Sequence, residues 1–283
     1  MPAALARRAR LSEDHAALAA ACEEGVGLCT IVGIDGSFSR RLGAQLAVMP
    51  DGRTVGSLSD GCLEAQLASD IRDLTAAKIA RYGRGSLKID FRLPCGGGLD
   101  ILLDPDPDRA ACRHAVKELA DRHPVRIALP QVSPLTNRRY IPNLSVLVFG
   151  EGPELDHLVK LATAMGIELD SYDKGRLTLG SPADDIRLDR WTAVVLLFHD
   201  HEWELPLLEQ AVASDAFYIG AQGGEEARIA RALALAKRGL PEEEIARIRS
   251  PIGLIPACKT PSTLALSALA EIAGAYEQLC AAP

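Results

Sequence analysis

The chain reads Gly-Ser-Leu-Ser-Asp-Gly-Cys-Leu-Glu from 56 to 64, a stretch of small residues that leads into a helical pattern. Apolar residues then recur at spacings of three and four, which predicts an amphipathic helix. They are Leu63, Leu67, Ile71 and Leu74. Cys62 is therefore expected in the first helical turn, where free backbone N–H groups and the helix dipole favour a thiolate or a phosphate. A tight connection with a buried, inert cysteine is the other interpretation.

The segments around this turn predict a small mixed α/β domain. Residues 27–33, 45–49 and 53–55 have the pattern of strands, and the helical pattern continues over 60–82. The loop 36–43 carries glycines, hydroxyls and two arginines, which suit a phosphate-like ligand. A solvated polar connection explains the same residues.

A cysteine and three glycines interrupt a later extended segment. Residues 86–92 alternate as a strand, Pro-Cys-Gly-Gly-Gly follows at 94–98, and residues 99–103 resume an apolar run. Successive glycines cost conformational entropy and bring no side chain to pack. They indicate a close backbone approach to a ligand, which Cys95 makes more attractive, or a hairpin loop.

The second half of the chain follows the order of a Rossmann βαβ unit. Residues 144–149 read as a buried strand, Gly150 and Gly152 open a helical pattern, and a second strand, 167–172, ends at Asp173. In such units the glycines allow a tight turn and the acidic residue binds a ribose hydroxyl. Here a leucine replaces the third small residue and two glutamates lie near the turn. The pattern therefore favours the fold more than it favours NAD(P) binding.

Two histidines flank an aspartate after the third strand of this half. The apolar strand 193–198 ends at His199, Asp200 and His201, and the carboxyl edge of an open parallel sheet is where ligands bind. Imidazole and carboxylate groups suit zinc, manganese or iron. The same residues would equally cap the next helix, so a metal site and a structural role are both open.

A second glycine-rich turn follows the fourth strand. Gly220 and Gly223 would let backbone N–H groups surround a phosphate at the start of the next helix. The last segment, 262–280, is an apolar, alanine-rich helix. It is expected to pack on the sheet or on a second subunit, which is the basis for expecting a homodimer.

Length and composition bound the remaining possibilities. The 283 residues suffice for two domains, and four prolines between 123 and 143 predict a linker between domains at 1–122 and 144–283. A net charge of −7 without a basic stripe argues against a nucleic-acid partner. No apolar run approaches the roughly 20 residues of a membrane span, and no secretory signal is evident, so a cytoplasmic protein is expected. The seven dispersed cysteines fit neither a disulfide framework nor a structural zinc site.

Taken together and in order, these motifs resemble the XdhC/CoxI family over nearly the whole chain. In the first half they are Gly36-Ser37, Arg40, Gly43-Ala44, Asp51-Gly52, the turn 56–64 and Cys95-Gly96-Gly97. In the second half they are Phe149-Gly150-x-Gly152, the run 199–202, Tyr218-Ile219-Gly220-Ala221, Pro251-Ile252-Gly253-Leu254 and Thr260-Pro261.

The resemblance implies an α/β protein with an N-terminal mixed α/β domain followed by a Rossmann-like, doubly wound parallel sheet. It implies an accessory chaperone without turnover of its own. Such a chaperone binds molybdenum cofactor (molybdopterin), supports its sulfuration with a cysteine desulfurase and inserts it into a molybdenum hydroxylase apo-enzyme such as xanthine dehydrogenase. The implied cofactor-binding residues are Ser37, Arg40, Gly43, Ser57, Ser59, Gly61, Cys62, Glu64, Cys95, Gly96 and Gly97. Glu64 would orient the turn or cap the helix.

An NAD(P)-dependent oxidoreductase is the alternative from another class. Its nucleotide would lie at Gly150, Gly152, Asp173, Gly220 and Gly223. A divalent-metal enzyme built on residues 199–201 is a third interpretation. Titration with NAD and NADP and elemental analysis distinguish these two from a molybdenum cofactor chaperone.

Overall fold

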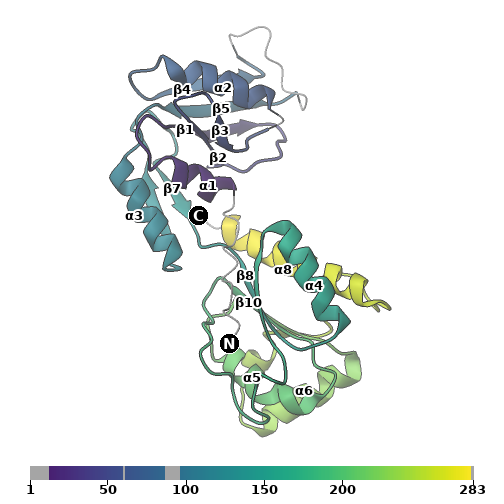
Figure 1. Cartoon of the computed structure of the whole chain (residues 1–283). Coiled ribbons are helices and arrows are strands. Elements are labelled where there is room, and N and C mark those ends of the chain that lie inside the picture. The colour runs from purple at the N-terminus through teal and green to yellow at the C-terminus, as the bar shows by residue number, and fades with distance from the viewer. Residues whose placement is uncertain (1–12, 60, 87–95, 282–283) are drawn as a thin grey trace. The chain divides into compact units, whose positions relative to one another are not determined.

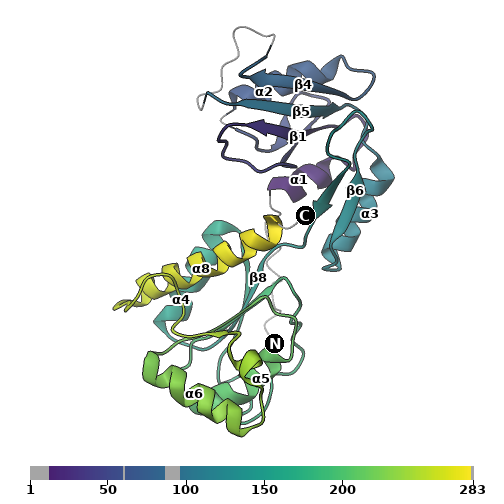
Figure 2. The ribbon, with the colours of Figure 1, turned by 180° about the vertical axis from the view of Figure 1, so that it is seen from behind.

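The computed structural model describes residues 13–59, 61–86 and 96–281, and the chain divides into two compact units between Pro142 and Asn143. Each unit has its own five-stranded sheet with helices on both faces (Figures 1 and 2). The predicted α/β class, with a mixed domain followed by a Rossmann-like one, is confirmed. Within the described residues, no helix has the length and apolar character that crossing a membrane requires.

The N-terminal unit is built on an antiparallel sheet in the order β3-β2-β1-β5-β4. Its strands are β1 (Gly27–Asp35), β2 (Gln45–Val48), β3 (Thr54–Gly56), β4 (Lys78–Gly83) and β5 (Gly98–Asp104). Because side chains alternate along β1, Cys29 packs with α2 (Cys62–Arg72), whereas Leu28 packs with α1 (Glu13–Ala20) and α3 (Arg109–Ala120). Burial of both sheet faces fixes the strand register.

The helix predicted over 60–82 is wrong in its second half. α2 ends at Arg72, and residues 78–83 form β4 at the sheet edge. Tyr82 is fully buried, and its hydroxyl donates a hydrogen bond to Asp70 Oδ2 at 2.7 Å. Pairing with β5 and this contact to α2 override the local helical pattern. The strand predicted over 86–92 lies, apart from Ser86, outside the described residues.

The segment 123–143, expected to connect the domains, contains a two-stranded hairpin. Its strands are β6 (Val125–Ala128) and β7 (Asn137–Tyr140). The hydroxyl of Tyr140, a residue only 2% exposed, donates to Gln45 Oε1 at 2.6 Å, and Gln45 Nε2 donates to Thr30 Oγ1 at 3.0 Å. The hairpin therefore belongs to the N-terminal unit, whose boundary lies after Pro142.

We expect Tyr140→Phe to lower the free energy of unfolding of the N-terminal unit by about 1–3 kcal/mol, because the buried Gln45 Oε1 would lose the hydrogen bond that the Tyr140 hydroxyl donates. Cys29 is fully buried in β1, so its alkylation by a pulse of reagent at each urea concentration measures the unfolding of this unit. The control, Tyr276→Phe in the other unit, should leave Cys29 protection unchanged. Equal protection in both variants would show that the bond does not anchor the hairpin.

The C-terminal unit is a parallel sheet in the order β12-β11-β10-β8-β9. Its strands are β8 (Ser145–Phe149), β9 (Glu168–Tyr172), β10 (Thr192–Leu196), β11 (Tyr218–Ala221) and β12 (Ile248–Arg249). Helices α4 (Pro153–Met165) and α8 (Pro261–Ala281) cover one face (Figures 1 and 2). The other face packs with α5 (Glu204–Val212) and α6 (Glu225–Lys237), and α7 (Glu242–Ile245) follows α6. Chain order reverses between β8 and β10, and ligands bind at such a switch point in open α/β sheets.

Candidate functional site

The turn before α2 is organised by one buried carboxylate. Oε1 of Glu64 accepts hydrogen bonds from the N–H groups of Leu58 and Ser59, and Oε2 accepts one from the N–H of Gly61 at 2.8 Å. Burial opposes the charged form, yet these donors and the residue's own N–H hold the pKa of the Glu64 carboxyl below its ordinary value. Glu64 therefore both orients the turn and caps the helix, the two roles expected of it.

Cys62 is the first residue of α2 and is exposed to solvent. Gly61, which precedes it, has φ of +99° and ψ of −33°, a conformation that favours glycine, and open space surrounds its Cα. The thiol thus lies at the start of a helix and on an accessible surface. The predicted placement in the first helical turn is correct, and the alternative of a buried cysteine is wrong.

An arginine from the loop 36–43 reaches this turn. Arg40 donates from Nε to the carbonyl oxygen of Ser57 at 3.2 Å and from Nη2 to Ser57 Oγ at 3.1 Å. Ser57 Oγ also donates to the carbonyl oxygen of Ser59 at 3.3 Å. A guanidinium group and two hydroxyls therefore accompany the turn that carries Cys62.

The same loop approaches the glycine segment. A Cβ placed on Gly36 would lie 3.6 Å from Gly97 Cα, so the two backbones are close, and Ser37 beside them is exposed. Gly96 has φ of +67° with open space around it. Cys95 lies outside the described residues. The sequence motifs 36–40, 56–64 and 96–97 thus meet in one region of the N-terminal unit.

Gly43 has a packing role in this structure. Its φ is +83°, a Cβ there would lie 2.8 Å from Arg138 Cδ, and its carbonyl oxygen accepts a hydrogen bond from Arg138 Nε at 2.6 Å. Arg138 in turn lies over the Tyr140 ring, 4.7 Å from its centroid. Gly43 therefore permits the close approach of β7.

The first turn of the Rossmann-like unit carries negative charge. Lys174, which the sequence pattern did not indicate, lies 3.6 Å from Glu151 Oε1 and 3.7 Å from Asp200 Oδ2. Gly152 has φ of +100°, and a Cβ on Gly150 would lie 2.7 Å from Leu197 Cβ. The glycines therefore serve the tight turn, whereas the two carboxylates oppose a pyrophosphate.

Asp173 and the histidine run have local partners. Asp173 Oδ1 accepts from the N–H groups of Gly175 and Arg176 at 3.0 and 3.1 Å, which forms a turn after β9. Asp200 Oδ1 accepts from the N–H of Glu202 at 3.2 Å, and His199 is exposed. Among the described residues no group of three His, Cys, Asp or Glu is arranged to hold a metal ion, and the His201 side chain is not among them.

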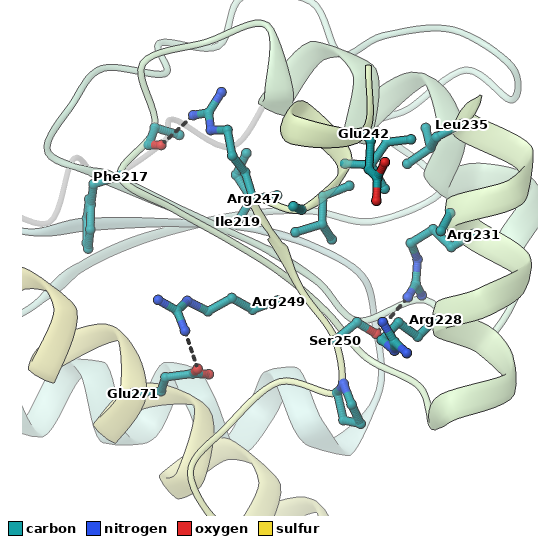
Figure 3. Close-up of a pocket in the computed structure, with 16 residues that line it drawn as sticks. Phe217, Ile219, Arg228, Arg231, Leu235, Glu242, Arg247, Arg249, Ser250 and Glu271 are labelled. Atoms are coloured by element: carbon teal, nitrogen blue, oxygen red, sulfur yellow. Dashed lines mark hydrogen bonds and ion pairs between the residues drawn. The ribbon is translucent and has the colours of Figure 1, made fainter. Parts of the chain in front are cut away.

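A cavity of about 790 Å³ lies along the edge strand β12 (Figure 3). Four guanidinium groups line it, and all have partners. Arg231 pairs with Glu204 at 2.9 Å and Arg249 with Glu271 at 3.5 Å. Arg228 pairs with Glu225, and Arg247 donates to main-chain carbonyl oxygens. The partners leave these four guanidinium groups occupied, and only the pair of Arg231 with Glu204 is fully buried.

Comparison with known proteins extends the observations on both units. A model of the XdhC and CoxI family matches residues 19–83, and a model of the XdhC Rossmann domain matches residues 146–272. The molybdenum cofactor insertion chaperone PaoD of Escherichia coli K12 is 33% identical over 94% of this chain and 90% of its own. The uncharacterized protein YqeB of the same organism is 24% identical over 87% of this chain and 42% of its own. A crystal structure described as a xanthine dehydrogenase from Bacillus halodurans shares the fold, with a TM-score of 0.72, 19% identity and coverage of 96% and 98% of the two chains.

Proposed function

Because the chain belongs to the XdhC and CoxI family, we propose that it is a maturation factor that binds molybdenum cofactor and inserts it into a molybdenum hydroxylase. The similarity to a molybdenum cofactor insertion chaperone over almost the full length of both chains supports this role. We further propose that it protects the cofactor during sulfuration by a cysteine desulfurase, in the cytoplasm.

The observation that carries the proposal is the ordered turn with the exposed Cys62. Molybdopterin carries a phosphate and a dithiolene-bound molybdenum, so its binding site needs anion donors and tolerates a soft ligand. Arg40 and the hydroxyls beside it, at the positive end of the α2 dipole, suit the anionic part, and a thiolate suits the metal. The hydrogen bonds from the turn to the Glu64 carboxylate, which we call the Glu64 clamp, hold these groups in place before the ligand binds. Less conformational entropy is then lost on binding.

Gel filtration with molybdenum cofactor tests this assignment. Protein mixed anaerobically with freshly released cofactor should carry molybdenum and pterin in near-stoichiometric amounts. Cys62→Ala and Arg40→Ala should each retain less than about a tenth of that amount, since each removes a principal ligand group. Matched controls are Cys22→Ala and Arg53→Ala, which alter a partly buried thiol and an exposed arginine of the same unit. Full retention by either test variant would remove that residue from the site.

An NAD(P)-dependent oxidoreductase is the second candidate, because the fold is Rossmann-like. The carboxylates Glu151 and Asp200 beside Lys174 weigh against a pyrophosphate at the first turn. Calorimetric titration with NAD and NADP tests this candidate, and a dissociation constant below millimolar would support an NAD(P)-dependent oxidoreductase. Stoichiometric divalent metal in chelator-free protein would likewise revive a site at residues 199–201.

The expected homodimer through the last helix has a competing explanation within one chain. α8 packs against α4 and the sheet, and Ala265, Leu269 and Ile272 are buried there. Its apolar composition is thus accounted for without a partner, although Leu266 remains 53% exposed. Light scattering of the purified protein measures the oligomeric state directly.

A further inference from the structure

One arginine joins three strands at the end of the N-terminal sheet where the motifs 36–40 and 96–97 meet. Arg81, on the edge strand β4, lies opposite Asp100 of β5, and Asp35, the last residue of β1, lies opposite Gly98 of β5. The Arg81 guanidinium donates from Nη1 to Asp100 Oδ2 at 3.1 Å and from Nη2 to Asp35 Oδ2 at 2.9 Å. A side chain on an edge strand therefore reaches across β5 to the end of β1.

The guanidinium crosses β5 through space that a glycine leaves. A Cβ on Gly98 would lie 2.7 Å from Arg81 Cζ, and a Cβ on Gly33 of β1 would lie 2.5 Å from Asp100 Oδ2. Neither glycine has φ in the left-handed region, so the structure uses their lack of a side chain and not an unusual backbone conformation. Both glycines thus make room for the ion pairs of Arg81.

The same group of side chains is bonded to the backbone of the glycine segment. Arg81 Nε donates to the carbonyl oxygen of Arg84 at 2.8 Å, and the N–H of Arg84 donates to the carbonyl oxygen of Gly97 at 2.8 Å. Arg84 Nε also donates to Asp35 Oδ2 at 3.2 Å. Gly36 directly follows Asp35, and a Cβ on Gly36 would lie 3.6 Å from Gly97 Cα. Arg81 is therefore bonded to the residues that flank both backbones at their point of approach.

The exposure of these side chains indicates an effect on local order more than on overall stability. Arg81 is 27% exposed, and Asp35 and Asp100 are 44% and 40% exposed. Ion pairs in contact with solvent contribute little to the free energy of unfolding. A planar guanidinium with three acceptors on three segments nevertheless fixes their relative positions, which a lysine ammonium on a flexible stem does less well.

We propose that Arg81 is a positioning residue for the N-terminal cofactor site. It holds the start of the loop 36–43 against the glycine segment 96–97, and Gly98 is required because it lets the guanidinium pass. Arg81 acts through the backbones of Gly36 and Gly97 and does not touch the cofactor. The inference rests on the proposed function, because the two segments that it joins carry groups assigned to cofactor binding.

Hydrogen exchange of the cofactor-free protein, followed by NMR, tests the positioning itself. In Arg81→Gln the N–H of Arg84 should exchange about ten-fold faster or more, because its acceptor on Gly97 is no longer held in place. The reference is the N–H of Met49, which donates to the carbonyl oxygen of Arg53 at 2.8 Å near the opposite end of the sheet. Unchanged exchange at Arg84, or equal acceleration at both N–H groups, would overturn the proposal.

The gel-filtration assay measures the consequence for the cofactor. Arg81→Gln should retain at least about three-fold less molybdenum and pterin than wild type, because the loops must then be ordered on binding. Gly98→Ala should do the same although it leaves every charge in place, and Arg81→Lys should not restore retention. The matched control, Arg53→Gln, removes an exposed ion pair with Asp51 in the same unit and should retain as much as wild type. Slow alkylation of Cys29 without urea verifies that each variant is folded.

Asp35→Asn combined with Arg81→Gln distinguishes one network from two independent defects. Because both residues act through the same contact, the double variant should retain about as much cofactor as the weaker single variant. Losses that multiply in the double variant, or normal retention by Arg81→Gln, would overturn the proposal and leave the proposed function intact. Absence of cofactor from wild type would instead refute the proposed function, and the exchange of the Arg84 N–H alone would then decide whether Arg81 holds the two segments.

Discussion

Glu204→Gln is expected to lower the free energy of unfolding of the C-terminal unit by about 3–5 kcal/mol, because it leaves Arg231 buried without its counter-charge. The two side chains are 1% and 4% exposed and are 2.9 Å apart at their closest atoms. Their geometry is bidentate, with Arg231 Nε and Nη2 donating at 3.0 and 3.1 Å. An amide in place of the carboxylate keeps the volume but offers one acceptor and no charge.

Arg231 also bonds to other segments, which explains why the loss of its ion pair should destabilise the whole unit. Arg231 also donates to Ser250 Oγ and to the carbonyl oxygen of Gln222, both at 2.8 Å. One guanidinium group therefore joins α5, α6, the end of β11 and the segment after β12. We expect the loss of Glu204 to loosen the cavity along β12, which Arg231 and Ser250 line.

An equivalent pair on the surface provides the matched control. Glu209 and Arg238 also join α5 to α6, with Arg238 Nη2 donating to Glu209 Oε2 at 2.8 Å, but they are 28% and 47% exposed. Glu209→Gln should therefore cost no more than about 1 kcal/mol. Both tryptophans, Trp191 and Trp203, lie in this unit, so tryptophan fluorescence in urea reports its unfolding alone. Similar midpoints for the two variants would contradict the importance of burial.

Local patterns predicted the elements whose contacts are close in sequence. The order of strands and helices in the C-terminal half gave the Rossmann-like fold, and the small-residue turn placed Cys62 at the start of α2. β4 was missed because its stability comes from pairing with β5 and from the contact of Tyr82 with Asp70. The hairpin β6–β7 was missed for the same reason, since Tyr140 finds its acceptor 95 residues earlier.

In the candidate sites, too, residues that belong to local motifs could be predicted, and residues whose partners are distant in sequence could not. The resemblance to the XdhC/CoxI family implied that the motifs 36–40 and 56–64 act together, and the contact of Arg40 with Ser57 joins them. Lys174 and the pair of Arg231 with Glu204 gave no sequence signal, because a lone charged residue reads as a solvated side chain until the fold supplies its partner. Recognition of such residues required the three-dimensional structure.

Glu64→Ala is expected to destabilise the N-terminal unit by about 2–3 kcal/mol and to reduce molybdenum cofactor retention as strongly as Cys62→Ala. The substitution leaves the N–H groups of Leu58, Ser59 and Gly61 without their shared acceptor. Part of the turn then loses the conformation that presents the thiol. Hydrogen exchange of peptides from β1 and β5 in urea measures the stability of this unit.

Glu64→Gln should separate the contribution of the negative charge of Glu64 from that of its side-chain size, because the amide is uncharged and of nearly the same volume. The pKa of the Glu64 carboxyl is lowered in the folded protein, so its contribution is complete above its unfolded value of about 4.5 and is lost as pH falls through the folded pKa. The amide variant lacks this dependence, and one of its oxygen positions becomes a donor that faces the Gly61 N–H. The stability difference between wild type and Glu64→Gln should therefore be largest near neutral pH and shrink below pH of about 4.5.

Glu24→Gln, an exposed site in the same unit, should show a much smaller difference at every pH. A pH-independent gap between wild type and Glu64→Gln would mean that the carboxylate charge does not hold the turn, and that the exposed thiol is positioned by the glycines alone.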